Sequence, residues 1–212
     1  PSFPSTISPA TRSPPTARRP PARPHSGAEP TPPMRPRVSV YLAISLDGRI
    51  ARPDGTLDWL ARVQDPADDH GYAAFMATVD AIVMGRATHD TILGFGLPAW
   101  PFAGKRTVVC TTRPLAPHDG VETHTGDLAP LIARLGDAGA RRLYLDGGRT
   151  VQQGLREGLV DDLTLSVVPV VLGRGIPLFT DDLPESDWRL TGTHSHPTGL
   201  VQLRYDRAPT PT

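Results

Sequence analysis

The sequence contains a single cysteine, Cys110, which lies in the apolar run TVVC. One cysteine cannot form an intramolecular disulfide, and it excludes zinc sites built from several cysteines. We therefore expect a buried structural thiol rather than a nucleophile, in a protein of the reducing cytoplasm.

Long apolar runs and an excess of one charge sign are also missing. The chain has no run of about 18 apolar residues and no apolar signal-peptide segment, which predicts a soluble protein. Lys plus Arg and Asp plus Glu number 22 each, and residues 38–212 hold 16 basic against 21 acidic side chains. Nothing in this balance favours nucleic acid or an anionic membrane as a partner.

Large apolar side chains are scarce in residues 1–36, which hold 12 of the 25 prolines. Such a segment cannot offset its ordering entropy by burial. We predict a disordered Pro/Arg-rich extension over 1–36, one folded domain over 37–207 and a short disordered tail over 208–212. A proline-rich ligand for an SH3-type domain is an alternative reading of the extension.

Beyond residue 37, short β-rich runs alternate with helical ones. The pattern predicts strands at 38–44, 80–85, 106–112, 121–125 and 141–147, and helices at 66–79, 86–93, 127–139 and 149–158. Three further β runs, over 161–173, 188–196 and 200–206, finish the chain. This order predicts an α/β fold with a mixed, mostly parallel central sheet, flanking helices and an antiparallel C-terminal edge.

Glycine, hydroxyl and arginine side chains follow the predicted parallel strands. The segments are SLDGRIA (45–51), GRAT (85–88), TTR (111–113) and GGRT (147–150). Ligands of such sheets bind outside the carboxyl ends of the strands. Glycine lets backbone N–H groups approach a pyrophosphate, and arginine binds phosphate through charge-assisted hydrogen bonds. The ordered set predicts a dinucleotide site, although the Rossmann fingerprint G-x-G-x-x-G is absent.

Longer motifs carry a resemblance to a known family. The chain holds SLDGRIA, VDAIVMGRATHD (79–90), LYLDGGRTVQQGL (143–155) and GLVDDLTLSVVPVVLGRGIPLF (158–179) in family order. On these motifs, residues 37–207 resemble the dihydrofolate reductase-like superfamily. Within it, they resemble the C-terminal reductase domain of the bacterial riboflavin-biosynthesis deaminase-reductase, RibD. The resemblance implies an NADPH-dependent oxidoreductase that forms a homodimer, here without the deaminase domain.

The resemblance also implies where the cofactor lies. Backbone groups of Ala43 and Ile50 would hold the nicotinamide carboxamide, Arg86 would approach the adenosine 2′-phosphate, and Thr88 would approach the pyrophosphate. The complete implied set is Ala43, Ile50, Gly85, Arg86, Thr88, Thr111, Thr112, Arg113, Gly147, Gly148 and Arg149. Several arginines around one phosphate favour NADPH over NADH.

Hydride transfer to a C=N or C=O carbon also needs an acid. Asp69 falls where dihydrofolate reductases carry their substrate-binding carboxylate, and Ser166 falls where they hold a hydroxyl. Asp58, in a predicted loop, is a third candidate catalytic residue. For Asp69, helix capping is the alternative explanation. His194 and His196 share one strand face without an evident third ligand, so we expect no metal site.

Three hypotheses on function follow from the motifs. The first is an NADPH-dependent reductase of a pyrimidine- or pterin-like heterocycle, with 5-amino-6-(5-phosphoribosylamino)uracil of riboflavin biosynthesis among the candidate substrates. The second is a dihydrofolate reductase, because the segment after residue 85 is closer to that family. The third is a non-catalytic NADP-binding protein. Asp146 and the ending PVVLGRGIPLF favour the first.

Overall fold

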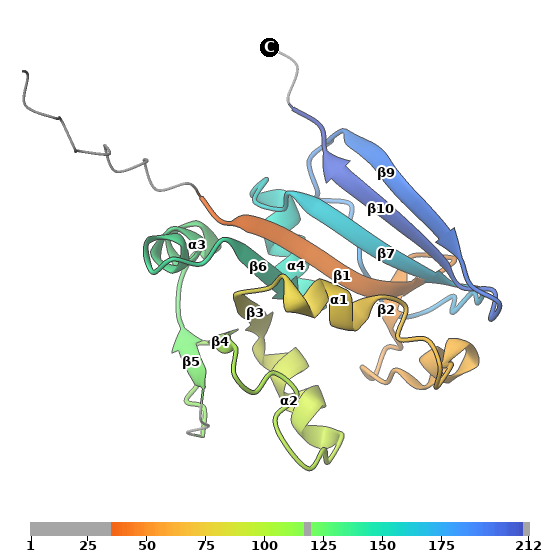
Figure 1. Cartoon of the computed structure of the whole chain (residues 1–212), viewed down its shortest axis with the longest axis horizontal. Coiled ribbons are helices and arrows are strands. Elements are labelled where there is room, and N and C mark those ends of the chain that lie inside the picture. Colours follow the sequence, from red (N-terminus) through yellow and green to blue (C-terminus); the bar gives the residue numbers. More distant parts are fainter. Residues whose placement is uncertain (1–34, 117–119, 210–212) are drawn as a thin grey trace, which may run out of the picture. The chain divides into compact units, whose positions relative to one another are not determined.

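An eight-stranded sheet forms the centre of the computed structural model, which describes residues 35–116 and 120–209 (Figure 1). Its strands are β1 (Arg37–Ser45), β3 (Ala81–Gly85), β4 (Arg106–Cys110), β5 (Val121–His124), β6 (Arg142–Asp146), β7 (Asp162–Val168), β9 (Trp188–Ser195) and β10 (Val201–Arg207). Most of the predicted extension, residues 1–34, and the last residues of the predicted tail, 210–212, lie outside the described ranges.

The strand order is β5-β4-β3-β6-β1-β7-β10-β9. The six strands from β5 to β7 run parallel, and β10 is antiparallel to both β7 and β9. The predicted mostly parallel sheet with an antiparallel C-terminal edge is therefore confirmed. None of the helices in the described part of the chain has the length and apolarity that a membrane crossing needs.

Alternate side chains of the strands pack on opposite faces of the sheet. One face carries α3 (Leu128–Asp137) and α4 (Gly148–Arg156), which cover Val83, Leu143 and Leu145. The other face carries α1 (Tyr72–Ala77), whose Tyr72, Phe75 and Met76 pack against Ile82, Met84 and Tyr144. Figure 1 shows α1 in front of the sheet. This period of two follows from the pleat of the strands and places the core in two layers.

The helix predicted over 66–79 is wrong in its first half. The structure has only the six residues of α1, and two aspartate turns precede it: Asp65 Oδ1 accepts from the N–H of Ala67 at 2.9 Å, and Asp68 Oδ1 accepts from the N–H of His70 at 2.7 Å. His70 has φ 57° and Gly71 has φ 83°, values that a right-handed helix cannot contain. Aspartate side chains here compete with the helix for backbone donors.

Three short elements were not predicted. The 3₁₀ helix η1 (Asp58–Val63) buries Trp59 and Val63, and β2 (Arg49–Ala51) pairs with β8 (Ile176–Pro177) in a second, antiparallel sheet. The remaining predicted helix, α2 (Arg86–Gly94), starts at the residue after β3. Cys110 lies at the end of β4, and burial raises the pKa of its thiol to about 11.

Candidate cofactor site

The turns after β3 and β6 meet at the carboxyl edge of the sheet, because these two strands are neighbours. Each turn ends in a glycine that packs against a threonine of the other turn. A Cβ at Gly85 would lie 2.9 Å from Oγ1 of Thr150 on α4, and a Cβ at Gly147 would collide with Oγ1 of Thr88 on α2. Gly147 also has φ +87°, which favours glycine. The two helix starts are therefore interlocked.

Glycine also occupies the N-cap of both helices. Gly85 at the start of α2 and Gly147 at the start of α4 have no side chain, so no side-chain hydrogen bond from the N-cap residue occupies the first N–H groups of either helix. The first turn of a helix leaves backbone N–H groups without intrahelical partners, and the helix dipole adds positive potential there. Two such ends, held side by side, form a donor set that suits a phosphate or pyrophosphate.

Gly148 packs against the SLDGRIA segment (45–51) and does not face open space. A Cβ at Gly148 would lie 2.5 Å from Cδ1 of Ile50 on β2. The strand β2 is held in turn by β8, and Gly175 just before β8 packs so closely that its Cβ would collide with the carbonyl oxygen of Ala51. The predicted residues Ile50, Thr88, Gly147 and Gly148 are thus brought together. Packing within the protein is a second reason for the double glycine, beside phosphate approach.

Arg86 is engaged by neighbouring groups. Its Nε donates to Asp90 at 2.7 Å, and its Nη1 donates to the carbonyl oxygen of Pro114 at 3.0 Å. The second contact joins the start of α2 to the loop after β4. Arg86 therefore lies beside the predicted TTR segment, but with a carboxylate against it.

The TTR segment forms a tight turn at the end of β4. The N–H of Arg113 donates to Thr111 Oγ1 at 3.1 Å, and the N–H of Thr111 donates to the carbonyl oxygen of His124 at 2.9 Å. Thr112 and Arg113 are exposed, as is Arg149 on the first turn of α4. Their exposed polar groups are open to a ligand at this edge.

The predicted nicotinamide contact Ala43 pairs with the predicted catalytic residue Ser166 across β1 and β7. Ala43 also packs against the cluster of Trp59 and Val63 from η1. Ser166 is buried, and the fully buried Gln202 donates to its Oγ at 3.3 Å. The same Gln202 amide donates to the carbonyl oxygen of His70, the residue after Asp69, at 3.0 Å. Ser166 and the start of α1 are therefore linked through one side chain.

Asp69 and Asp58 have structural partners. Asp69 is exposed, and its two oxygens accept from the N–H groups of Gly71 at 2.9 Å and Ala73 at 2.7 Å, which caps α1. Asp58 forms a paired contact with Arg52, at 2.6 and 2.9 Å, and this pairing lowers the pKa of Asp58. Their catalytic roles stay predictions. No hydrogen bond or ion pair in the described residues joins Asp58 to Asp69 or Ser166.

Asp146 is a carboxyl group that was not selected as an acid from the sequence. It ends the central strand β6, directly before Gly147, and burial raises its pKa. Tyr72 and Tyr144 lie near enough that the charge of Asp146 raises the pKa of both hydroxyls, after burial. The signal in the sequence is an acidic residue at the end of an otherwise apolar strand, next to the double glycine.

Asp47 in the turn after β1 holds the loop that follows β7. Its carboxylate accepts from Ser45 Oγ at 2.6 Å and from the N–H groups of Leu172 at 3.0 Å and Gly173 at 2.8 Å. These bonds, that of Ser45 first, lower the pKa of Asp47 to about 2. The turn over residues 45–48 thus also anchors a distant loop.

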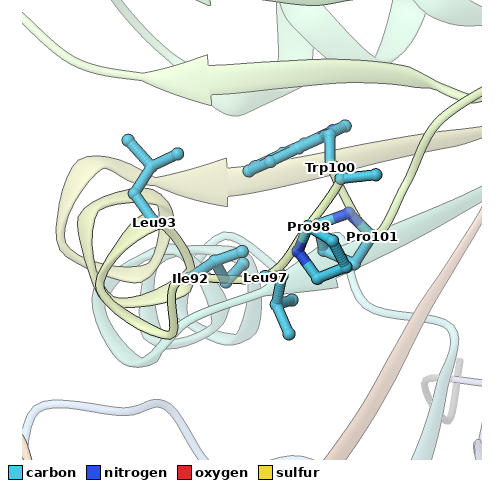
Figure 2. A pocket seen from close by; sticks show the side chains of 7 residues that line it. Ile92, Leu93, Leu97, Pro98, Trp100 and Pro101 are labelled. Carbon is cyan, nitrogen blue, oxygen red and sulfur yellow. The ribbon is translucent and has the colours of Figure 1, made fainter.

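A hollow elsewhere on the surface is separate from these groups. It lies at the end of α2 and is lined by Ile92, Leu93 and residues 97–101, whose apolar side chains Figure 2 shows. None of its lining residues belongs to the predicted cofactor set.

Histidines lie together at another place, where sequence reasoning found only a pair. His196 lies directly after β9 and meets Asp68 and His70, which come from the segment before α1. The partner residues are far apart in the chain, so spacing gave no signal for the group. His194 stacks edge-on against His196, with ring centroids 4.4 Å apart, but is not part of the group.

Comparison with known proteins gives a consistent family. The family model described as RibD C-terminal domain matches residues 36–202. The uncharacterized protein YwjB of Bacillus subtilis is 36% identical over 177 residues, which cover 82% of this chain and 100% of that protein. A putative riboflavin biosynthesis protein from Shewanella sp. PV-4 is 36% identical with a TM-score of 0.77, over 82% of this chain and 99% of that chain.

A third similarity concerns the fold. The dihydrofolate reductase of Enterococcus faecalis, solved with NADP(H), has a TM-score of 0.57 at 16% identity, over 82% of this chain and 98% of that chain. The predicted dihydrofolate reductase-like fold is thereby confirmed.

Proposed function

Because the chain belongs to the RibD C-terminal domain family, we propose that it is an NADPH-dependent oxidoreductase that reduces a pyrimidine- or pterin-like heterocycle. The family is that of a reductase domain, which favours an enzyme of pyrimidine-reductase type over a non-catalytic nucleotide-binding protein. The Shewanella relative carries the description of a riboflavin biosynthesis protein, so 5-amino-6-(5-phosphoribosylamino)uracil is the first substrate to test.

The observation that carries the cofactor proposal is the interlocked pair of glycine-capped helix starts. Gly85 and Gly147 leave the first turns of α2 and α4 free of side-chain caps at the same edge of the sheet. Their N–H groups would bind the pyrophosphate, with Thr88 and Arg149 beside it. The backbone of Ala43 and Ile50 would orient the nicotinamide, whose bound form supplies the hydride.

Discrimination for the 2′-phosphate is proposed for Arg86, with Thr111, Thr112 and Arg113 on the same side. Arg86 pairs with Asp90 at 2.7 Å, so a bound phosphate would have to compete with that carboxylate for the guanidinium. Thr112 and Arg113 are exposed at the neighbouring strand end and add donors for the same group.

For the acid, we propose Asp146 ahead of Asp69, Ser166 and Asp58. A general acid needs a raised pKa, and burial favours the protonated carboxyl. Several carboxyl groups of the described residues have a pKa that departs from the ordinary value. Among them, only the pKa of Asp146 is raised, and the pKa of Asp58 is lowered. Asp146 would be the proton donor, and Asp69 with Ser166 would orient the substrate.

NADPH oxidation with a panel of substrates tests the proposal. We expect absorbance loss with the ribosylaminopyrimidine phosphate, and a larger rate with dihydrofolate would favour the dihydrofolate reductase hypothesis. NADPH binding without turnover of any substrate in the panel would favour the non-catalytic hypothesis.

Asp146→Asn should lower kcat by about 100-fold or more and leave the Kd of NADPH unchanged, as loss of a general acid does. Loss of kcat with Asp69→Asn alone would instead assign the acid to Asp69.

Cofactor choice is tested on the Arg86–Asp90 pair. Arg86→Ala should weaken NADPH by about 1.5–3 kcal/mol and leave NADH unaffected. Asp90→Asn removes the competing charge and should tighten NADPH. Arg141→Ala, an exposed arginine at the opposite end of β6, is the control. Equal losses for both cofactors would place Arg86 outside the 2′-phosphate site.

The proposed homodimer is tested separately by light scattering.

A further inference from the structure

Three potential metal ligands converge between the segment before α1 and the turn after β9. The Nδ1 atoms of His70 and His196 lie 3.3 Å apart, Asp68 Oδ2 lies 2.6 Å from His196 Nδ1, and the same oxygen lies 3.5 Å from His70 Nδ1. His196 is buried, whereas the side chain of Asp68 is 36% exposed. The group therefore has a buried wall and an opening toward solvent.

The tautomer of His70 leaves a lone pair directed at this point. His70 Nε2 lies 3.1 Å from the carbonyl oxygen of Val63, an acceptor that can be satisfied only by an N–H at Nε2. The neutral ring then has an unprotonated Nδ1, which faces His196 and Asp68. Histidine ligands of metals characteristically donate their other ring N–H to a carbonyl or carboxylate in this way.

The backbone of His70 is fixed in an uncommon conformation that keeps the ring there. Its φ is 57°, and its N–H donates to Asp68 Oδ1 at 2.7 Å. Its carbonyl oxygen accepts from Tyr41 Oη at 2.5 Å and from Gln202 Nε2 at 3.0 Å. A left-handed non-glycine residue is costly and persists only where its surroundings hold it. Position 70 is therefore preorganised.

We propose that Asp68, His70 and His196 bind one divalent transition-metal ion of the zinc class. Imidazole nitrogens with one carboxylate oxygen suit Zn²⁺ and Co²⁺, and they do not suit Mg²⁺, which prefers oxygen ligands. Ligand distances of about 2.0–2.1 Å in a tetrahedron place ligand atoms about 3.3 Å apart. Two of the three separations already match this value. The short contact between Asp68 and His196 would open by about 0.7 Å as the ion replaces their shared proton.

The ion would have an open fourth position and would join two distant parts of the chain. Three protein ligands leave the fourth position of the tetrahedron for a water molecule. Solvent can reach that position from the side of Asp68, because this side chain is partly exposed. His70 and His196 are 126 residues apart in sequence, so the ion would bind the segment before α1 to the β9–β10 turn. Such a link stabilises the folded state only where metal is bound. Binding of the ion can be measured without the proposed cofactor and without turnover.

Metal binding to the chelator-treated full chain tests the proposal. We expect one Zn²⁺ per chain by calorimetry and d–d absorption when Co²⁺ is added, with no displacement by millimolar Mg²⁺. His70→Ala and His196→Ala should each weaken binding by at least about 100-fold, more than loss of an outer partner costs. His194→Ala is the matched control and should bind as the unaltered chain does. Absence of stoichiometric Zn²⁺ binding, or unchanged binding in both alanine variants, would overturn the proposal.

A second measurement covers the case in which a histidine variant does not fold. Zn²⁺ at about 100 times its Kd should raise the Tm of the unaltered chain by about 5 °C or more. Asp68→Asn keeps the size of the side chain and should fold without metal, but most of this rise should be lost. A Tm that Zn²⁺ leaves unchanged in the unaltered chain would show that the group is only an Asp–His hydrogen-bond cluster.

Discussion

Asp146 is the residue at which burial and ionisation conflict most clearly. Burial raises its folded-state pKa above the ordinary value of 3.8, so the stability of the fold falls as the pH rises from about 3.8 to the folded-state pKa and stays lowered above it. Asp146→Asn keeps an oxygen for the N–H of Gly147, which donates to Asp146 at 2.8 Å. We therefore expect the variant to be more stable at pH 7–8. The difference should shrink as the pH falls and disappear below about 3.8, which urea unfolding across this range measures.

Gly148 has two possible reasons to lack a side chain, and Ile50 separates them. Gly148→Ala places its Cβ 2.5 Å from Ile50 Cδ1, the end of a flexible side chain that can move aside, so the single variant should lose only about 1 kcal/mol through overpacking. Ile50→Ala removes the obstructing atom and keeps the backbone that is proposed to hold the nicotinamide. We expect the double variant to be as stable as Ile50→Ala, because the obstructing atom is gone. Its affinity for NADPH should still be lower than that of Ile50→Ala, because the new Cβ would occupy the space of the phosphate.

The Gly148 result is decided by calorimetric Kd values and melting curves on the same samples. If NADPH binds the double variant as tightly as it binds Ile50→Ala, the glycine serves packing alone. The cofactor's phosphates would then have to lie elsewhere along the edge formed by α2 and α4.

At the scale of elements, Asp47 joins the turn after β1 to the loop after β7. Its pKa of about 2 means that the ionised form is stabilised by its hydrogen bonds, so the stabilisation is present above about pH 3.8 and is lost as the pH falls toward 2. Asp47→Asn should be less stable at neutral pH, and its difference from the unaltered chain should vanish between about pH 4 and 2. This sign is opposite to that of Asp146. Faster amide exchange at Leu172 and Gly173, its two donors, should accompany the change.

The elements that the sequence predicted well are those with a dominant local signal. Val83, Leu143 and Leu145 lie in strands whose apolar runs have no competing interpretation, and both faces of these strands are buried. The start of α1 fails because Asp65 and Asp68 bond to nearby N–H groups, a choice that depends on His70 being held by Tyr41 and Gln202. A prediction from the local sequence pattern cannot account for partners that lie so far away in the chain.

At the scale of the whole molecule, topology explains which parts of the site could be predicted. The four motifs follow β1, β3, β4 and β6, and parallel strands place their carboxyl ends at one edge, so the convergence of Ile50, Thr88 and Gly147 followed from strand order. The side chains that fill the spaces beside the glycines could not be predicted. Neither could the meeting of His196 with Asp68 and His70, because the path of the β9–β10 turn determines it.

The N-terminal boundary of the folded domain gives the last prediction. Residues 1–34 are poor in large apolar side chains, so deleting them should leave the Tm and the Kd of NADPH unchanged. Arg35 is different: it donates to the carbonyl oxygen of Leu159 at 2.9 Å and pairs with Asp161 at 2.6 Å. Both partners are partly exposed, so the pair is worth about 0.2–1 kcal/mol. A deletion of residues 1–35 should therefore lower the Tm by about 0.4–4 °C relative to the shorter deletion. A fall of several degrees with the shorter deletion already would contradict the prediction, since it would require residues 1–34 to pack on the domain.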